Sequence, residues 1–221
     1  MYNEIIKQMK RIDFMAGITK SKIEVKKQHK LETLYNKAFE LFTTKGFSKT
    51  SISDIVSNAG VAKGTFYLYF KDKYDIRNKL IAKKGQEICN KAYEVVNNSE
   101  NADKLEDRVI IFTDSVINQF VEDTLMLRFI AKNLNYGVIH QALADETVTE
   151  AGGFNIAKLY QHVQETTDVR FKSPEIAIYM IVELVSGTCY TSILEEKPVP
   201  IDELKPHLFE AIRAIMASQI I

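Results

Sequence analysis

Proline is confined to the last quarter of this 221-residue chain, at positions 174, 198, 200 and 206. Because a proline in a helix interior removes a backbone hydrogen bond and clashes with the preceding turn, residues 1–173 lack the strongest helix breaker. Leu, Ile, Lys, Glu and Ala recur at helical spacing, without the period-2 alternation that is typical of strands. The sequence therefore predicts an all-α protein.

Charge is divided unevenly along the chain. Residues 1–95 contain 19 Lys and Arg against 10 Asp and Glu, a net charge of +9, and residues 96–221 carry −9. An excess of positive charge in one half is typical of a surface that meets a polyanion. Chance clustering of solvated side chains would give the same numbers, so charge alone leaves both interpretations open.

Several classes of protein lack support in the sequence. There is no apolar N-terminal block like a signal peptide, and no uninterrupted apolar run approaches the ~18 residues of a membrane span. We therefore expect a cytoplasmic protein without a membrane partner. Cys89 and Cys189 form no CxxC pair and are expected to be small core residues. Without a metal-ligand spacing, a nucleophile elbow or a phosphate loop, we expect no metal, no cofactor and no enzyme activity.

A cluster of short helices is predicted in the N-terminal part. The first helix begins at about Lys27 and ends at Gly46, which can adopt the positive φ of a helix terminus. Ser51 and Asp54 have the spacing of a capping box, so they indicate the start of a second helix that Gly60 ends. A third, short helix over 62–70 follows. Two short helices joined by a turn containing glycine are the layout of a helix-turn-helix.

The stretch from Thr50 to Lys73 resembles the DNA-binding domain of the TetR family, because its Ala-Gly-Val, Lys-Gly-Thr and aromatic positions have that family's spacing. The resemblance covers about residues 27–80. It implies an N-terminal three-helix helix-turn-helix domain and a C-terminal helical ligand-binding and dimerisation domain. We expect an N-terminal extension or arm over 1–26, the DNA-binding domain over 27–75 and the C-terminal domain over 76–221, with a fourth helix from about residue 72 to residue 96 linking the two.

The resemblance also implies roles for individual residues. Lys63, Gly64 and Thr65 match positions that face bases or the nearest phosphates, and Tyr67 and Lys73 match phosphate contacts. The complete set of implied DNA-binding residues is Thr50, Ser51, Lys63, Gly64, Thr65, Tyr67, Leu68, Tyr69 and Lys73. Thr50 and Ser51 could equally act only as helix caps. Phe66 and Phe70 are expected in the core.

Helices are also predicted over 103–121, 123–135, 155–165, 174–195 and 202–218. The segment 174–195 is apolar on all sides, so we expect it to be buried against its own core and against a second subunit. With 202–218 it resembles the helix pair of the family's dimer interface, although the central core of a monomer would have the same pattern. The predicted interface residues are Tyr179, Val182, Ser186, Gly187, Leu204, Leu208, Ile212 and Ile215.

Aromatic and Met side chains crowd the middle of the chain. Phe112, Phe129 and Tyr136 are candidates for lining a ligand cavity, although ordinary core residues have the same spacing. We predict a ligand-responsive transcriptional regulator, a homodimeric repressor that leaves a palindromic double-stranded DNA operator when a small apolar molecule binds. The alternative is a DNA-binding adapter whose C-terminal domain binds a protein partner.

Overall fold

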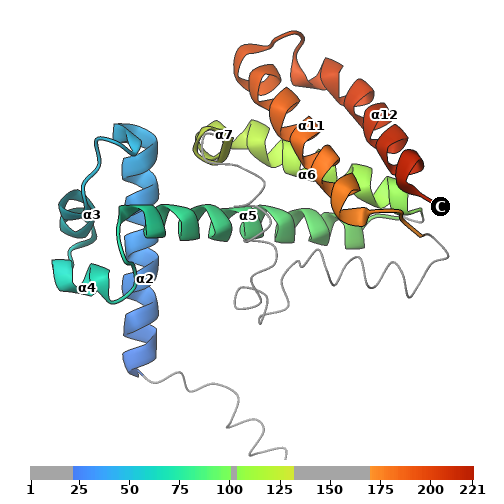
Figure 1. The fold of residues 1–221 in the computed structure, drawn as a ribbon. Coiled ribbons are helices and arrows are strands. Elements are labelled where there is room, and N and C mark those ends of the chain that lie inside the picture. The colour runs from blue at the N-terminus through green and yellow to red at the C-terminus, as the bar shows by residue number, and fades with distance from the viewer. Residues whose placement is uncertain (1–21, 101–103, 132–169) are drawn as a thin grey trace, which may run out of the picture. The chain divides into compact units, whose positions relative to one another are not determined.

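The computed structural model describes residues 22–100, 104–131 and 170–221. Helices are the only regular elements among them, apart from one antiparallel bridge between Phe171 and Ile220, so the predicted all-α class is confirmed (Figure 1). The chain divides into two compact units, Met1–Ile76 and Arg77–Ile221. Of the arm predicted over residues 1–26, residues 1–21 lie outside the described residues, and residues 22–26 form the first part of the helix Lys22–Leu41. The helix predicted over 155–165 also lies outside the described residues.

The first unit contains three helices and a π-helical turn, and it includes the first residues of a fourth helix. Its elements are α2 (Lys22–Leu41), the π-helical turn η1 (Phe42–Gly46), α3 (Ile52–Ala59), α4 (Lys63–Tyr67) and the start of α5 (Lys73–Asn97). Gly46 and Gly60 have φ values of +89° and +65°, which glycine adopts without steric cost. The helix predicted from Lys27 begins five residues earlier, and α4 is shorter than predicted.

The core of the first unit is largely aromatic. Phe66 of α4 is fully buried and Phe70 is 2% exposed, and Leu34 of α2 and Ile55 of α3 are also fully buried. The rings of Phe66 and Phe70 lie 5.3 Å apart, and Tyr35 meets Phe70 edge-on at 5.2 Å. Burial of one phenylalanine contributes roughly 1.5–3 kcal/mol, so these two rings hold α4 and the following turn against the unit.

The second unit consists of the remainder of α5 and four further described helices. These are α6 (Leu105–Glu122), α7 (Thr124–Ala131), α11 (Pro174–Glu195) and α12 (Ile201–Gln219). α11 packs most extensively against α12, and both contact α6. Their shared core contains Ile117, Cys189, Leu208, Ile212 and Met216. Cys189 is therefore a core residue, as the sequence predicted, whereas Cys89 is half-buried.

Two predicted interface residues belong to this core instead. Leu208 is 3% exposed and Ile212 is fully buried, so neither can meet a second subunit. The reason is that the apolar face of α12 closes the unit's own core against α6 and α11. Leu204 and Ile215, on the borders of that face, are half-buried.

α11 has apolar side chains on opposite faces. Ala177 and Cys189 are buried, while Ile176, Tyr179 and Met180 are 52%, 44% and 39% exposed. By length and composition alone, this 22-residue helix also meets the criterion for a membrane span. Its apolar residues do not form one uninterrupted run, so the sequence pattern alone does not indicate a span. Core helices of soluble proteins pass the same test but are mostly buried, whereas only 17% of the apolar window of α11 is buried. The informative feature of α11 is therefore its exposed apolar stripe.

Candidate nucleic-acid interface

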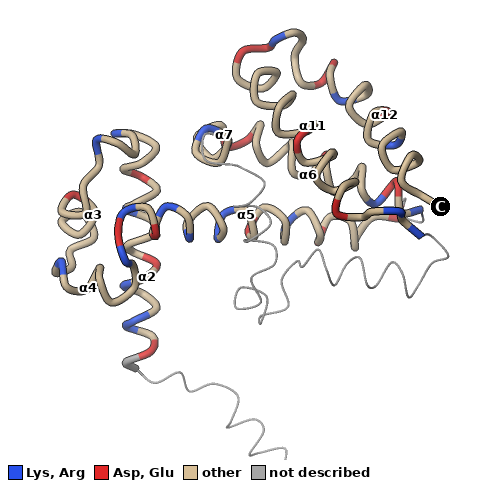
Figure 2. Tube along the Cα trace, in the orientation of Figure 1, with Lys and Arg blue, Asp and Glu red and all other residues tan. Residues whose placement is uncertain are grey.

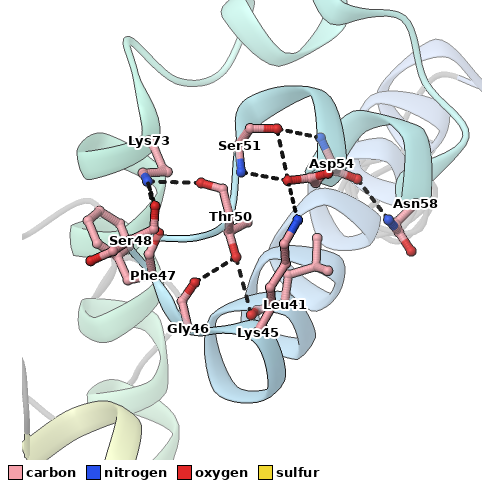
Figure 3. Close-up of polar contacts among 10 residues, drawn as sticks. All are labelled: Leu41, Lys45, Gly46, Phe47, Ser48, Thr50, Ser51, Asp54, Asn58 and Lys73. Carbon is pink, nitrogen blue, oxygen red and sulfur yellow. Dashed lines mark hydrogen bonds and ion pairs between the residues drawn. The ribbon is translucent and has the colours of Figure 1, made fainter.

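The N-terminus of α3 is closed by a reciprocal capping box, as predicted (Figure 3). The backbone amide of Asp54 donates to Ser51 Oγ at 3.1 Å, and the backbone amide of Ser51 donates to Asp54 Oδ2 at 2.8 Å. Lys45 Nζ lies 2.8 Å from the same carboxylate oxygen. Ser51 is exposed, but its side chain is already used to cap the helix.

The same bonds shift the acidity of the capping carboxylate. The hydrogen bond from Lys45, followed by those from the backbone and side chain of Ser51, lowers the pKa of Asp54 to about 2. The Asp54 carboxylate is therefore ionised at neutral pH. Its negative charge stabilises the positive end of the α3 dipole.

Thr50 has a different position from the one the resemblance implied. Its side chain is 1% exposed, and its hydroxyl donates to the carbonyls of Gly46 at 2.8 Å and Leu41 at 3.3 Å. These carbonyls lie at the two ends of η1, where the π-helical register interrupts the regular ladder of α2. The Thr50 hydroxyl thus satisfies the backbone inside the unit, so the expected side-chain contact to DNA is wrong.

Lys73, the first residue of α5, is also directed inward (Figure 3). Its ammonium donates to the carbonyls of Phe47 and Thr50, each at 2.8 Å, and lies 3.5 Å from that of Ser48. It also stands 4.4 Å from the centre of the Phe47 ring. The lysine predicted to bind a phosphate therefore binds the turn between η1 and α3.

The outer face of α4 is the most exposed part of the predicted site. Lys63 and Gly64 are exposed, Tyr67 is 53% exposed and Leu68 is 80% exposed. Positions i, i+1, i+4 and i+5 of a helix share one face, and the buried Phe66 anchors the opposite face. Four predicted residues are thus brought together on one surface.

The remaining predicted residues of α4 and of the turn after it are partly buried. Thr65 and Tyr69 are half-buried, and the Tyr69 hydroxyl donates to the backbone carbonyl of Lys27 at 3.2 Å, which braces α2. No described heavy atom lies within 4 Å of a Cβ built on Gly64. Internal packing therefore does not require glycine at this exposed helical position, where it costs about 1 kcal/mol relative to alanine.

The described part of the second unit has an open groove, and the predicted ligand-cavity residues are not among those that line it. Phe129 is 6% exposed and Phe112 is half-buried, while Tyr136 lies outside the described residues. An open groove of about 420 Å³ is lined by one face of α6 together with Val95 and Phe209, and neither described candidate lines it. Among residues 22–100, 104–131 and 170–221, no group of three or more His, Cys, Asp or Glu is placed to hold a metal.

The part of the chain that contains this site is similar in sequence to known transcriptional regulators. Residues 34–80 match the model of bacterial regulatory proteins of the tetR family. The chain is 54% identical over 44 residues to the uncharacterised HTH-type transcriptional regulator YvdT of Bacillus subtilis, covering 20% of this chain and 23% of that protein. It is 38% identical over 66 residues to the HTH-type transcriptional regulator AcrR of Shigella flexneri, covering 30% and 29%. The matched segments thus span less than a third of these curated relatives.

A solved structure extends the similarity in fold to most of the chain. The transcriptional regulator FadR from Bacillus subtilis, in complex with stearoyl-CoA, aligns with a TM-score of 0.57 at 20% sequence identity. The alignment covers 82% of this chain and 96% of FadR. At this identity the likeness concerns the fold, an N-terminal helix-turn-helix followed by a helical C-terminal part.

The capping box generates a pH prediction. The folded-state pKa of Asp54, about 2, lies below the value of about 3.9 for an unfolded chain. Its contribution to stability is therefore present above that unfolded value and is lost as the pH falls through the folded one. We expect Asp54→Asn to flatten the fall in unfolding free energy between about pH 4 and pH 2, measured by urea denaturation.

Glu94→Gln is the matched control, because it removes an exposed carboxylate of α5 that makes no side-chain hydrogen bond or ion pair within the described part of the chain. Its curve should run parallel to that of the wild type. Parallel curves for Asp54→Asn as well would contradict the assignment.

Proposed function

Because this chain belongs to the tetR family of bacterial regulatory proteins, we propose that it is a DNA-binding transcriptional repressor. The observation that supports this function best is the exposed face of α4, with Lys63, Gly64, Tyr67 and Leu68 opposite the buried Phe66. A major groove about 12 Å wide admits one helix, and α4 is the second helix of the helix-turn-helix. The regulator would act in the cytoplasm, where its operator is.

The chemistry of this face fits a DNA duplex. Lys63 makes no side-chain hydrogen bond or ion pair among the described residues, so its ammonium is available to a phosphate or a base edge. The exposed Gly64 allows close approach of the backbone, and Leu68 offers an apolar contact for a thymine methyl group. Figure 2 shows the lysines of the first unit along α2, α4 and the start of α5. The net charge of +9 over residues 1–95 would attract the phosphate backbone.

We expect Lys63→Ala and Tyr67→Phe each to weaken binding by about 1–3 kcal/mol, since each removes a group that contacts DNA directly. The probe is a duplex that the wild-type protein selects from a random-sequence pool, and binding is measured by fluorescence anisotropy over a range of salt concentrations. Lys91→Ala, at an exposed lysine of α5, is the control and should bind normally. If the Lys63→Ala/Tyr67→Phe double variant keeps wild-type affinity, α4 is not the DNA-contacting helix.

The exposed stripe of α11 supports a two-fold dimer. Ile176, Tyr179, Met180, Glu183 and Gly187 are all exposed and recur at helical spacing along one face. Exposing the apolar side chains of Ile176, Tyr179 and Met180 to water is unfavourable, and the opposite face of α11 is already closed by the unit's own core. The exposed glycine permits close approach of a second copy of the helix, and two copies would present two α4 helices to a palindromic operator.

We expect the wild-type protein to be a dimer and Gly187→Arg to be a folded monomer, because a long charged side chain would separate the two stripes. Size-exclusion chromatography with light scattering measures the mass, and circular dichroism checks the fold. Glu94→Arg, at an exposed position of α5, is the control and should remain dimeric. A monodisperse wild-type monomer at micromolar concentration would exclude the proposed interface.

We propose further that an apolar effector binds in the second unit and releases the DNA. α5 is continuous from Lys73 to Asn97 and therefore belongs to both units, so a change in its tilt would alter the spacing of the two DNA-binding heads. Phe112, Phe129 and Tyr136 remain the proposed contacts. FadR is a fold relative that holds stearoyl-CoA, which makes a long acyl chain a reasonable first probe.

We expect stearoyl-CoA to bind the free protein about 5 to 150 times more tightly than the DNA-bound protein, because linkage requires the coupling to be reciprocal. Isothermal titration with and without the selected duplex measures both affinities, and Phe129→Ala should weaken binding to the free protein. Equal affinities would exclude release by this effector. Absence of acyl-CoA binding, together with a protein partner retained by the second unit, would favour the adapter function.

A further inference from the structure

We propose that Lys73 is a positioning residue, which fixes the turn that presents α3 and does not itself bind a DNA phosphate. The inference rests on the proposed DNA-binding function, and it changes the role that resemblance alone gives this lysine. The turn consists of residues 47–50, between η1 and the N-cap Ser51.

The first argument is the saturation of the ammonium group. A lysine ammonium has three N–H donors and no acceptor. The carbonyls of Phe47, Ser48 and Thr50 surround it at 2.8, 3.5 and 2.8 Å, and the Phe47 ring lies on it at 4.4 Å. A phosphate oxygen could bind only by displacing one of these carbonyls, which would release the turn.

The second argument is that the start of α5 is already occupied by a carboxylate. Asp72 Oδ1 accepts hydrogen bonds from the backbone amides of Tyr74 at 2.7 Å and Asp75 at 2.8 Å. The Asp75 carboxylate in turn accepts from the amide of Lys71 at 2.8 Å. The amides of Lys71, Tyr74 and Asp75 at this helix end are therefore satisfied, and two negative charges beside them disfavour an anion.

The third argument is what the bonds of Lys73 position. Carbonyl dipoles that point at one place repel one another unless a cation lies between them, so the lysine stabilises the inward orientation of the Phe47 and Thr50 carbonyls. From the other side, the Thr50 hydroxyl binds Gly46 and Leu41, and the Thr50 amide donates to Phe47. Thr50 directly precedes Ser51, so the place of the α3 N-terminus follows from the place of Lys73.

Salt dependence distinguishes positioning from phosphate binding. Each neutralised phosphate contributes about 0.9 to the slope of log affinity against log salt on duplex DNA. We expect Lys73→Met to lower affinity for the selected duplex at least about tenfold with an unchanged slope, because charged hydrogen bonds to the turn are lost. Lys63→Met gives the comparison slope for an exposed lysine of α4, and Lys91→Met controls for loss of a lysine.

A conservative variant gives an independent outcome. Arginine keeps the charge, but its planar guanidinium does not fit three converging carbonyls as an ammonium does. We therefore expect Lys73→Arg to bind as weakly as Lys73→Met. Wild-type affinity for Lys73→Arg, or a slope lowered by about 0.9 for Lys73→Met, would assign the lysine to a phosphate and overturn the proposal. Unchanged affinity for both variants would mean that DNA binding does not depend on the turn that Lys73 holds. That result would also overturn the proposal.

Lysine acetylation of the wild-type protein tests the proposal without any variant. With mass-spectrometric detection, Lys73 should react slowly in free protein and at the same rate in the complex with the selected duplex. Lys63 should react quickly and become protected by DNA. Fast reaction of Lys73 that DNA suppresses would overturn the proposal, even if the variants fail to fold. Failure of the wild-type protein to select or bind any duplex would instead contradict the proposed function itself.

Discussion

The proposed DNA-binding surface on α4 depends on the burial of Phe66 and Phe70. α4 has only five residues, and isolated helices shorter than about 12–15 residues are marginal in water. Its helical form therefore comes from the two phenylalanines that the core holds at 0% and 2% exposure. Once Phe66 is fixed inward, helical geometry turns Tyr67 and Leu68 outward. The orientation of the exposed α4 surface therefore follows from the burial of Phe66 on the opposite side of the helix.

The second unit shows the same relation between a buried face and an exposed one. α11 buries Ala177 and Cys189 in the core that it shares with α6 and α12, and this leaves Ile176 and Tyr179 to the solvent. A helix that is apolar all round cannot satisfy both faces within one small unit. A second copy of the chain covers such a stripe with identical chemistry, which is why the exposed face favours a symmetric dimer over a random contact.

Much of this could be predicted from the sequence, because the signals involved are local. The capping box of Ser51 and Asp54, the positive φ of Gly46 and Gly60 and the bounds of α11 and α12 each depend on residues close in sequence. The helical pattern could not say which apolar stripe of α12 closes the core. Leu208 and Ile212 were consequently expected at an interface, whereas they are buried in the unit's own core.

The roles of Thr50 and Lys73 could not be predicted because their partners are backbone carbonyls. The carbonyls that bind Lys73 lie 23 to 26 residues earlier in the chain, and a carbonyl has no side-chain signature in a sequence. Only the fold shows that a threonine and a lysine, both chemically suited to a phosphate, are used to hold a turn.

This use of polar groups narrows where recognition can occur. Lys45, Asp54 and Ser51 satisfy one another at the start of α3, and Thr50 and Lys73 satisfy the turn before it. Groups that are already hydrogen-bonded gain little from a new partner, because an old bond must first be broken. The exposed side chains of α4 do not have this cost. We therefore propose that α4 discriminates among DNA sequences. The polar network around α3 would set the orientation in which α4 meets the major groove.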